Sequence, residues 1–338
     1  MKYLISLAGI VITVFIVGIF LAPAPVARSY DSSLLLKVPM ANSSAWRFTE
    51  GYAISRFGKH GFNAYLPENS ASRIYLHGDS YVEALQVSDD NKPDAVMTRF
   101  YNENPVVYGY GRSGTGLPSF IVHARECERA FGKPLCHVFF VTSISSDIFD
   151  DSGVDFVWEK EVLKTNPNAA FDSMRDKSAR IFNQLHLNFI SSAGQLFSTW
   201  LAGLNRQNTL SKKNSGTTGD ESLKLRQQIQ RLVSEMKKGI EAPCVIAYCP
   251  FVPSIANGEI CQINEDSANA ILFREIVEHN GFQWVDTTPA MLELFKTQGV
   301  FARGFANCSK PGNGHLNKNG IDAVFTYVAA KVKELYVF

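Results

Sequence analysis

The stretch Arg73–Val87 reads RIYLHGDSYVEALQV. Its first part, Arg73–His77, is a short run of β-branched and apolar residues, which is typical of a buried strand. Gly78–Ser80 follows, and Tyr81–Leu85 has helix-compatible spacing. The pattern therefore predicts a serine at the carboxyl edge of a sheet and beside a helix N-terminus, where backbone N–H groups favour negative charge.

Ser80 in this setting has two features that a nucleophile needs. One is exposure at a sheet edge, and the other is a set of donors for the oxyanion that forms when it attacks an ester carbonyl. The alternative is a Gly-Asp-Ser turn that only caps a helix. In either case we expect Asp79 to brace the turn by accepting hydrogen bonds from nearby backbone N–H groups.

Length and composition describe a globular protein. The chain has 338 residues, of which 46% are apolar and 19% are charged, and its formal net charge is +1. This length suits one large domain or two modest ones. The charge balance and the absence of a basic cluster with interleaved aromatics give no reason to expect nucleic acid as a partner. No His/Cys cluster has zinc spacing, so we predict neither a metal nor a cofactor.

The N-terminus predicts export. Residues Tyr3–Ala27 carry no charge and Leu4–Leu21 is almost wholly apolar, which is long enough to span a bilayer. We expect residues 1–28 to form an uncleaved membrane anchor, with a cleaved signal segment as the alternative. The folded body is then extracytoplasmic, as in a bacterial periplasm, or secreted if the segment is removed.

Six cysteines are compatible with an oxidising compartment. Cys127 and Cys136 fall at the end of a predicted helix and the start of the next strand, so a local disulfide is plausible. Cys261 with Cys308 could form a second disulfide. The remaining two, Cys244 and Cys249, flank a strand and are predicted to be a buried thiol pair.

From Arg73 onward the chain alternates strands and helices. Strands are expected at 73–77, 106–110, 136–142, 245–248 and 282–286, and helices at 93–102, 117–131, 221–238, 268–280, 291–296 and 321–335. Residues 29–72 are expected to be an irregular lead-in with one or two edge strands packed on the core. Residues 153–220 are expected to be a mostly helical insertion. This alternation predicts a parallel sheet of about five strands covered on both faces, whose ligand site lies at the carboxyl ends of the strands.

Three segments follow predicted strand ends, and this convergence favours a functional serine at position 80 over a residue that only caps a helix. They are Ser80 itself, the glycine-rich Gly111–Gly116, and Ser143–Asp147. A serine nucleophile also needs a base. His315 is the candidate, because it lies in a glycine-rich loop just before the last predicted helix, whereas the other histidines lack such a context.

Together, Gly-Asp-Ser after a strand, the glycine loop after the second strand and the His315-Leu316-Asn317 loop before the last helix resemble the SGNH (GDSL-type) hydrolases. The resemblance covers roughly residues 73–338, with 152–220 unmatched. It implies a flavodoxin-like α/β sandwich with a central parallel sheet. The lead-in is similar to that of extracytoplasmic members, some of which act on acylated cell-envelope glycans.

Carried over to this sequence, the resemblance makes Ser80 the nucleophile and its backbone N–H the first oxyanion donor. The Gly111 N–H becomes the second donor. Residues 139–147 align with the third sequence block of the family. Asp147 ends this block as a structural residue near the site, and Ser146 stands where the family has an oxyanion-binding Asn. Loss of such a donor can cost about two or three orders of magnitude in rate.

The last block departs from the family pattern as well. The Asp that usually lies three residues before the His is Gly312 here. Asn313 or Asp286 is then the possible orienter of the His315 ring. We therefore expect serine-dependent hydrolysis or transfer of an O-acyl ester, with acetyl as the expected acyl group and a small-molecule or glycan-linked ester as substrate. The alternative is a non-catalytic binding module with a degenerate site, and the last is a purely structural anchor protein.

Overall fold

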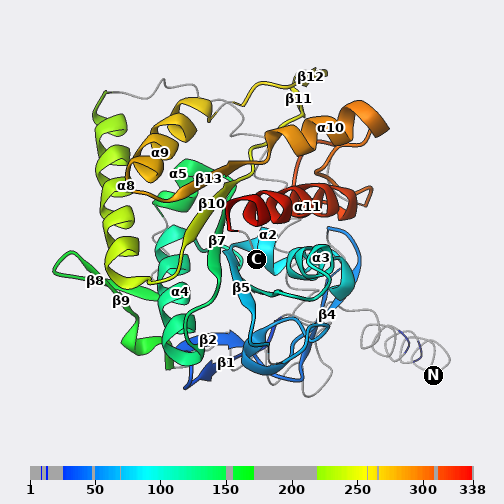
Figure 1. Ribbon diagram of the computed structural model, residues 1–338. Coiled ribbons are helices and arrows are strands. Elements are labelled where there is room, and N and C mark those ends of the chain that lie inside the picture. Colours follow the sequence, from blue (N-terminus) through cyan, green and yellow to red (C-terminus); the bar gives the residue numbers. More distant parts are fainter. Residues whose placement is uncertain are drawn as a thin grey trace.

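The structure, a computed structural model, describes residues 9, 13, 26–47, 50–68, 70–149, 155–170, 219–256, 258–264, 266–307 and 311–336 (Figure 1). The predicted anchor or signal segment lies almost wholly outside this described part. Within it, none of the helices is both long and apolar enough to cross a membrane.

A five-stranded parallel sheet forms the centre of the molecule, in the order β13-β10-β7-β5-β6. The strands are β5 (Arg73–Gly78), β6 (Val106–Gly111), β7 (Cys136–Val141), β10 (Cys244–Tyr248) and β13 (Gln283–Asp286). All five match the predicted strands to within one residue at each end. Side chains alternate between the two faces, so Tyr75 packs on one side of β5 while Ile74 and Leu76 pack on the other.

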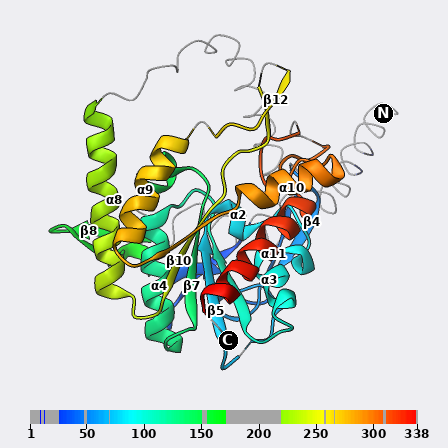
Figure 2. The ribbon, with the colours of Figure 1, turned by 45° about the horizontal axis from the view of Figure 1, so that its top comes forward.

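Helices cover both faces of this sheet (Figures 1 and 2). One face carries α4 (Leu117–Phe131), α8 (Gly219–Gly239) and α9 (Ser267–His279), whose apolar side chains form one core cluster. The opposite face carries α3 (Pro93–Phe100), α10 (Thr288–Gln298) and α11 (Lys318–Leu335), which form a second cluster. The flavodoxin-like α/β sandwich is thus confirmed, and its two helical layers leave the carboxyl edge of the sheet for the loops.

The five described cysteines are all free thiols, and the sheet explains why Cys127 and Cys136 are not bonded to each other. Cys127 lies in the core on the α4 face and Cys136 in the core on the α11 face, and both are free thiols. The sheet therefore separates the two thiols, and the predicted local disulfide was wrong. Cys244 and Cys249 are likewise buried free thiols on opposite faces. Cys261 is also a free thiol, and its expected partner Cys308 lies outside the described residues.

In the part of the chain that the structure describes, four short antiparallel hairpins surround the central sheet. Two come from the lead-in, β1 (Arg28–Asp31) with β2 (Leu36–Pro39) and β3 (Ser44–Arg47) with β4 (Ala53–Arg56). The others are β8 (Phe156–Glu159) with β9 (Val162–Thr165), and β11 (Ser254–Ala256) with β12 (Glu259–Cys261). The lead-in strands pair with each other and not with the central sheet, which corrects the expectation of edge strands. The predicted insertion helices, near 173–186 and 194–204, lie outside the described residues.

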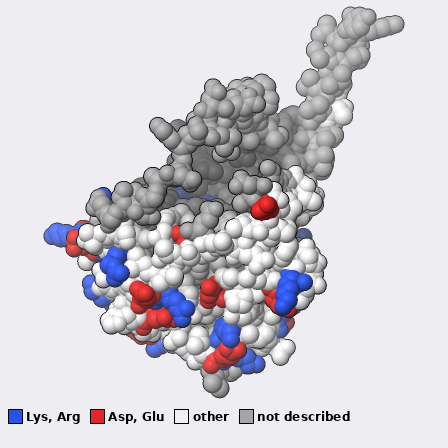
Figure 3. Space-filling view, turned by 90° about the horizontal axis from the view of Figure 1, so that it is seen from above, with Lys and Arg blue, Asp and Glu red and all other residues white. Residues whose placement is uncertain are grey.

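The remaining elements are short. Helices α2 (Ser80–Glu83) and α5 (Ile144–Ile148) follow β5 and β7, and 3₁₀ turns occupy Lys59–Gly61, Asp89–Asn91 and Pro167–Ala170. On the face seen in Figure 3, acidic and basic side chains are interspersed over the described surface. Among these residues no group of three or more His, Cys, Asp or Glu side chains is arranged to hold a metal ion.

Candidate active site

Ser80 begins α2, directly after β5 at the carboxyl edge of the sheet. Asp79 is the N-cap residue of this short helix, and its Oδ1 accepts the Tyr81 N–H at 2.9 Å. The turn therefore has the strand, cap and helix order that the sequence predicts. The backbone N–H of Ser80 belongs to the first turn of α2, where N–H groups have no partner within the helix. It is thus open to a ligand oxygen above the sheet.

His315 reaches Ser80 from the other end of the chain. The distance from His315 Nε2 to Ser80 Oγ is 2.8 Å, although 235 positions separate the two residues. This is within hydrogen-bond reach, so the imidazole can accept the serine proton. The Tyr81 ring lies 4.9 Å from the His315 ring between centroids and limits where the imidazole can turn.

The second ring nitrogen of His315 contacts Glu50. The Glu50 Oε2 atom lies 2.5 Å from Nδ1, while Oε1 accepts the backbone N–H of His315 at 2.8 Å. One carboxylate thus holds both the ring and the backbone of the same residue, and both side chains are about four-fifths buried, with exposed fractions of 22% and 16%. Acid, imidazole and hydroxyl form one hydrogen-bonded series, the arrangement that activates serine for acyl transfer.

Glu50 lies in the loop of the β3–β4 hairpin, in the lead-in that precedes the α/β core. The next residue, Gly51, has φ +72°, and a Cβ there would lie 2.4 Å from the Gln86 carbonyl oxygen, so only glycine fits. Asn307 holds the loop from the other side, because its Oδ1 accepts the Gly51 N–H and its Nδ2 donates to the Gly51 carbonyl, both at 3.0 Å. Backbone and side-chain contacts together position the carboxylate.

The two orienters predicted from sequence do other things. The Asn313 Oδ1 accepts the Gly314 N–H at 2.8 Å. The Asp286 Oδ1 accepts from the backbone and hydroxyl of Thr288 at the end of β13. Neither contacts the imidazole, so Glu50 replaces both as the residue that holds the ring.

The backbone at Gly312 explains why the acid does not come from the His315 loop. Gly312 has φ +79°, and a Cβ there would lie 3.0 Å from the Ser254 Cα and 3.1 Å from the Pro253 carbonyl oxygen. An aspartate at this position would be both strained and crowded. Glu50 therefore supplies the carboxylate from elsewhere in the chain. Its contact with the imidazole resembles the one expected of an Asp in the His315 loop.

The predicted oxyanion residues differ in their contacts and exposure. Gly111 ends β6 opposite Gly78 and packs against α2, where a Cβ would lie 2.0 Å from the Glu83 nitrogen. Ser146 is exposed on α5, and its hydroxyl lies 3.4 Å from Asp147 Oδ1. Their donation to an oxyanion stays a prediction.

Two buried carboxyl groups lie beneath this edge. The Asp147 Oδ2 accepts the N–H groups of Thr142 and Ser143 at 2.8 and 3.1 Å, which holds the turn after β7. Burial, and then the charge of nearby Asp79, raises the pKa of Asp147 to about 7. Burial also raises the pKa of Asp79, against the opposing effects of its hydrogen bond from Tyr81 and the positive charges nearby. Both carboxyl groups accept backbone N–H groups, and through these hydrogen bonds they hold the turns after β5 and β7.

Arg303 connects the His315 loop to the turn that carries Ser80. Its guanidinium is buried and donates to the Gly314 carbonyl at 3.4 Å and to the Cys249 carbonyl at 2.8 Å. The Tyr81 hydroxyl donates to the same Gly314 oxygen at 3.1 Å. The guanidinium also lies 4.7 Å from the Tyr81 ring centroid and 3.9 Å from that of Phe251. One cation thus contacts the residue after the serine and the residue before the histidine.

The lead-in supports the glycine loop as well. Arg28, the first residue of β1, forms an ion pair with the buried Glu83 at the end of α2. The other Glu83 oxygen accepts the backbone N–H of Ser113 at 3.1 Å and also its hydroxyl. Through these contacts the segment before the α/β core holds the loop that follows β6.

Solved structures that resemble this chain include two esterases and a lipolytic protein. They include a carbohydrate acetylesterase family member from Sinorhizobium meliloti, with 11% identity over 79% of this chain and 100% of that chain and a TM-score of 0.38. A lipolytic protein of the G-D-S-L family from Veillonella parvula has 14% identity over 78% and 98%, with a TM-score of 0.40. An acetylxylan esterase from Geobacillus stearothermophilus has 15% identity over 80% and 96%, with a TM-score of 0.38.

The Veillonella parvula protein is described as a member of the G-D-S-L family, and identities this low bear on the fold alone. Because the TM-scores are below 0.5, we base no functional argument on them. No family model matches the sequence, and no curated protein does so.

Proposed function

We propose that this chain is a serine-dependent esterase or O-acyltransferase. The observation that carries the proposal is the continuous series from Glu50 through both ring nitrogens of His315 to Ser80, with distances of 2.5 and 2.8 Å. A structural cap at Ser80 would not require an imidazole held by a carboxylate at hydrogen-bond distance from its hydroxyl.

In the first half of the reaction, Ser80 Oγ attacks the ester carbonyl carbon while His315 Nε2 takes its proton. Glu50 accepts the Nδ1–H, which fixes the tautomer and stabilises the imidazolium. The oxyanion is held by the Ser80 N–H, with the Gly111 N–H and the Ser146 hydroxyl as further donors. The carbon–oxygen bond to the alcohol then breaks, and His315 returns the proton to the departing alcohol oxygen. An acyl ester of Ser80 remains.

In the second half, His315 takes a proton from water or from an acceptor hydroxyl, whose oxygen attacks the acyl ester of Ser80. The bond between the acyl carbon and Ser80 Oγ then breaks, and His315 returns the proton to Ser80 Oγ. Water gives a carboxylic acid, and a hydroxyl gives a new ester. The acyl group that we propose is acetyl, and the ester is carried by an envelope carbohydrate outside the cytoplasm. The predicted membrane segment at residues 1–28 supports this location.

The rival proposal, a non-catalytic binding module, depends on the missing acid of the His315 loop and on the serine at position 146. A carboxylate at His315 Nδ1 removes the first of these reasons, so we favour the enzyme. A serine instead of an asparagine at position 146 lowers the expected rate, but it leaves the Ser80 nucleophile in place.

The test uses the full-length chain in detergent. We expect turnover of p-nitrophenyl acetate, covalent labelling of Ser80 by a fluorophosphonate, and a loss of about 10⁴-fold or more in kcat/KM for Ser80→Ala. Peptide mapping by mass spectrometry locates the adduct. Equal rates for the wild type and Ser80→Ala, with no adduct on residue 80, would favour the binding module.

A further inference from the structure

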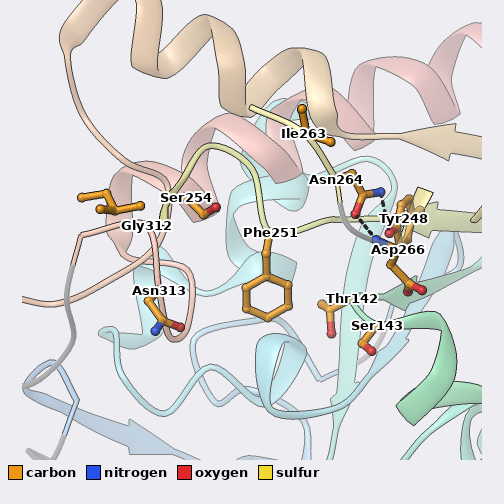
Figure 4. Close-up of a pocket in the computed structure, with 11 residues that line it drawn as sticks. Thr142, Ser143, Tyr248, Phe251, Ser254, Ile263, Asn264, Asp266, Gly312 and Asn313 are labelled. Atoms are coloured by element: carbon orange, nitrogen blue, oxygen red, sulfur yellow. Dashed lines mark hydrogen bonds between the residues drawn. The ribbon is translucent and has the colours of Figure 1, made fainter. Parts of the chain in front are cut away.

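A cavity of about 380 Å³ lies beside the candidate triad and has no role in the steps above. Its size falls within the range of small-molecule sites, about 300–1,000 Å³, and exceeds what an acetyl group would occupy. It is lined by Thr142, Ser143, Tyr248, Phe251, Ser254, Ile255, Ile263, Asn264, Asp266, Gly312 and Asn313 (Figure 4). These residues come from the ends of β7 and β10, the β11–β12 hairpin and its continuation, and the His315 loop.

We infer that this cavity binds the alcohol part of the ester, and that the alcohol is neutral and rich in hydroxyl groups, as a sugar residue is. The inference rests on the proposed function and adds to it which side of the ester is recognised and by which residues.

The position of the cavity assigns it to the alcohol. His315 must deliver its proton to the departing oxygen, so the alcohol lies on the His315 side of the ester. Gly312 and Asn313, two and three residues before His315, form one wall of the cavity. Phe251 forms another wall, and its ring meets the Tyr81 ring edge-on at 6.4 Å. The glycine loop follows β6, which lies on the other side of β5 from β7 and β10, so it lies on the opposite side of the serine strand from this cavity.

Polar groups on the cavity wall suit hydroxyl partners. The Tyr248 hydroxyl accepts from Asn264 Nδ2 at 2.9 Å, which leaves its own hydrogen to donate. Asn313 uses its Oδ1 on the Gly314 N–H, which leaves its amide hydrogens. Among the described residues, the side-chain hydroxyls of Ser143 and Ser254 make no hydrogen bond. An acyl chain in this cavity would leave these groups unpaired, at a cost for each one that is desolvated.

The charge around the cavity argues for a neutral ligand. The described lining contains no Lys or Arg, and it contains the carboxylate of Asp266. The Asp266 oxygens are held by the Ile144 N–H and by Asn269 Nδ2, both at 2.8 Å, so the charge is fixed at this edge. The nearby cation, Arg303, is buried against the ring of Phe251 and donates to backbone carbonyls. An anionic sugar would meet like charge with no lining counter-charge.

Apolar side chains complete the match. Phe251 is 39% exposed, and Ile255 and Ile263 are 45% and 75% exposed. A sugar ring has an apolar C–H face and a polar hydroxyl edge, so it can lie against these side chains while its hydroxyls reach the polar wall. In Figure 4 the Phe251 ring extends between Asn313 and the pair Thr142 and Ser143.

The experiment keeps the acyl group constant and changes the alcohol. The full-length chain is assayed with phenyl acetate, with methyl glucoside carrying one acetyl group, and with the corresponding acetylated methyl glucuronide. The test variant is Ser143→Ala with Ser254→Ala, and the matched control is Ser32→Ala in the exposed turn between β1 and β2. We expect the double variant to lower kcat/KM about tenfold for the acetylated glucoside and less than about twofold for phenyl acetate. We also expect the wild type to prefer the glucoside over the glucuronide by about tenfold or more.

A second series separates the alcohol from the acyl group. It compares p-nitrophenyl acetate, butyrate and hexanoate with the wild type and with Phe251→Ala, and we expect the truncation to leave the acyl-length preference unchanged. A rise in hexanoate turnover in that variant would assign the cavity to the acyl chain and overturn the inference. Equal losses of kcat/KM in the double variant on the acetylated glucoside and on phenyl acetate would also overturn it. So would turnover of phenyl acetate without turnover of the glucoside. In both cases the proposed esterase would still stand. Turnover of none of the esters would overturn the proposed function and this inference together.

Discussion

The α/β core and the β3–β4 hairpin make unequal contributions to the candidate site. The core supplies the serine, the histidine and the sheet edge on which they meet. The hairpin supplies a single carboxylate, Glu50, from a short two-stranded element outside the central sheet. The core is held by two apolar clusters on opposite faces of the sheet, whereas the hairpin loop is fixed by hydrogen bonds to Asn307 and His315.

The hairpin thus supplies a carboxylate to the imidazole although the loop that carries the histidine has no acid beside it. Gly312 cannot carry the side chain that an acid at this position would need, yet a carboxylate contacts the His315 Nδ1 atom. The acid, Glu50, lies far from Gly312 in the sequence but contacts the same imidazole nitrogen that an acid in the His315 loop would contact. Changes in the hairpin should therefore affect activity as strongly as changes in the core, and the predictions that follow test this from the largest expected effect to the smallest.

Glu50→Gln should have the largest effect in the hairpin. The amide keeps the size of the side chain and an oxygen for the His315 N–H, but it cannot stabilise an imidazolium. We expect a loss of about 10⁴-fold in kcat/KM for p-nitrophenyl acetate, the scale found when a triad acid becomes an amide. The measurement is steady-state kinetics, with Glu68→Gln, an exposed residue of the lead-in, as the matched control. Activity within tenfold of the wild type would mean that the core works without the hairpin.

Arg303→Met tests the core's own support of the His315 loop. The substitution keeps an unbranched apolar stem but removes the donors to Gly314 and Cys249 and the cation beside Phe251. A small displacement of the imidazole can cost about 10²-fold, so we expect a loss of this size in kcat with a smaller change in KM. Arg303→Lys, which keeps the charge without the planar fork, should recover only part of the rate. A variant that lowers only the thermal midpoint would assign Arg303 a structural role.

Asn307→Ala should have a smaller effect, because it weakens the position of Glu50 without removing it. Two hydrogen bonds to the Gly51 backbone are lost. Each contributes about 1 kcal/mol, so the hairpin loop should leave its docked position more often and kcat/KM should fall about tenfold. Asn168→Ala, at an exposed asparagine of the 3₁₀ turn Pro167–Ala170, is the control. Equal rates for the two variants would show that the loop is held without Asn307.

The core was predictable because its signal is local. The helix Leu117–Phe131 begins and ends at the predicted residues, and the five strands are apolar runs bounded by turns. Ser80 and His315 could be found for the same reason, since each lies in a short motif next to a strand or a helix.

The rest depended on contacts that no local pattern encodes. Glu50 lies in a hairpin loop whose weak alternation says nothing about a partner 265 positions away. Asn313 was chosen for its proximity in sequence, but its side chain turns back to the Gly314 N–H. The expected Cys127–Cys136 disulfide failed because neighbours in sequence pack on opposite faces of the sheet.

Asp147→Asn should have the smallest effect, on stability. Burial and the Asp79 charge raise the pKa of Asp147 to about 7, whereas an unfolded Asp titrates near 3.9. The folded state therefore binds the extra proton between these values, and the stability that this contributes is present at low pH and lost as the pH rises through about 7. Asn cannot ionise and still accepts one N–H, so we expect the variant to gain about 1–2 kcal/mol relative to the wild type between pH 5 and pH 8. Urea unfolding at both pH values measures this, with Asp322→Asn on the exposed face of α11 as the control. If the difference in unfolding free energy between the variant and the wild type stays constant with pH, Asp147 is ionised throughout. The core would then support a fixed negative charge beneath the serine.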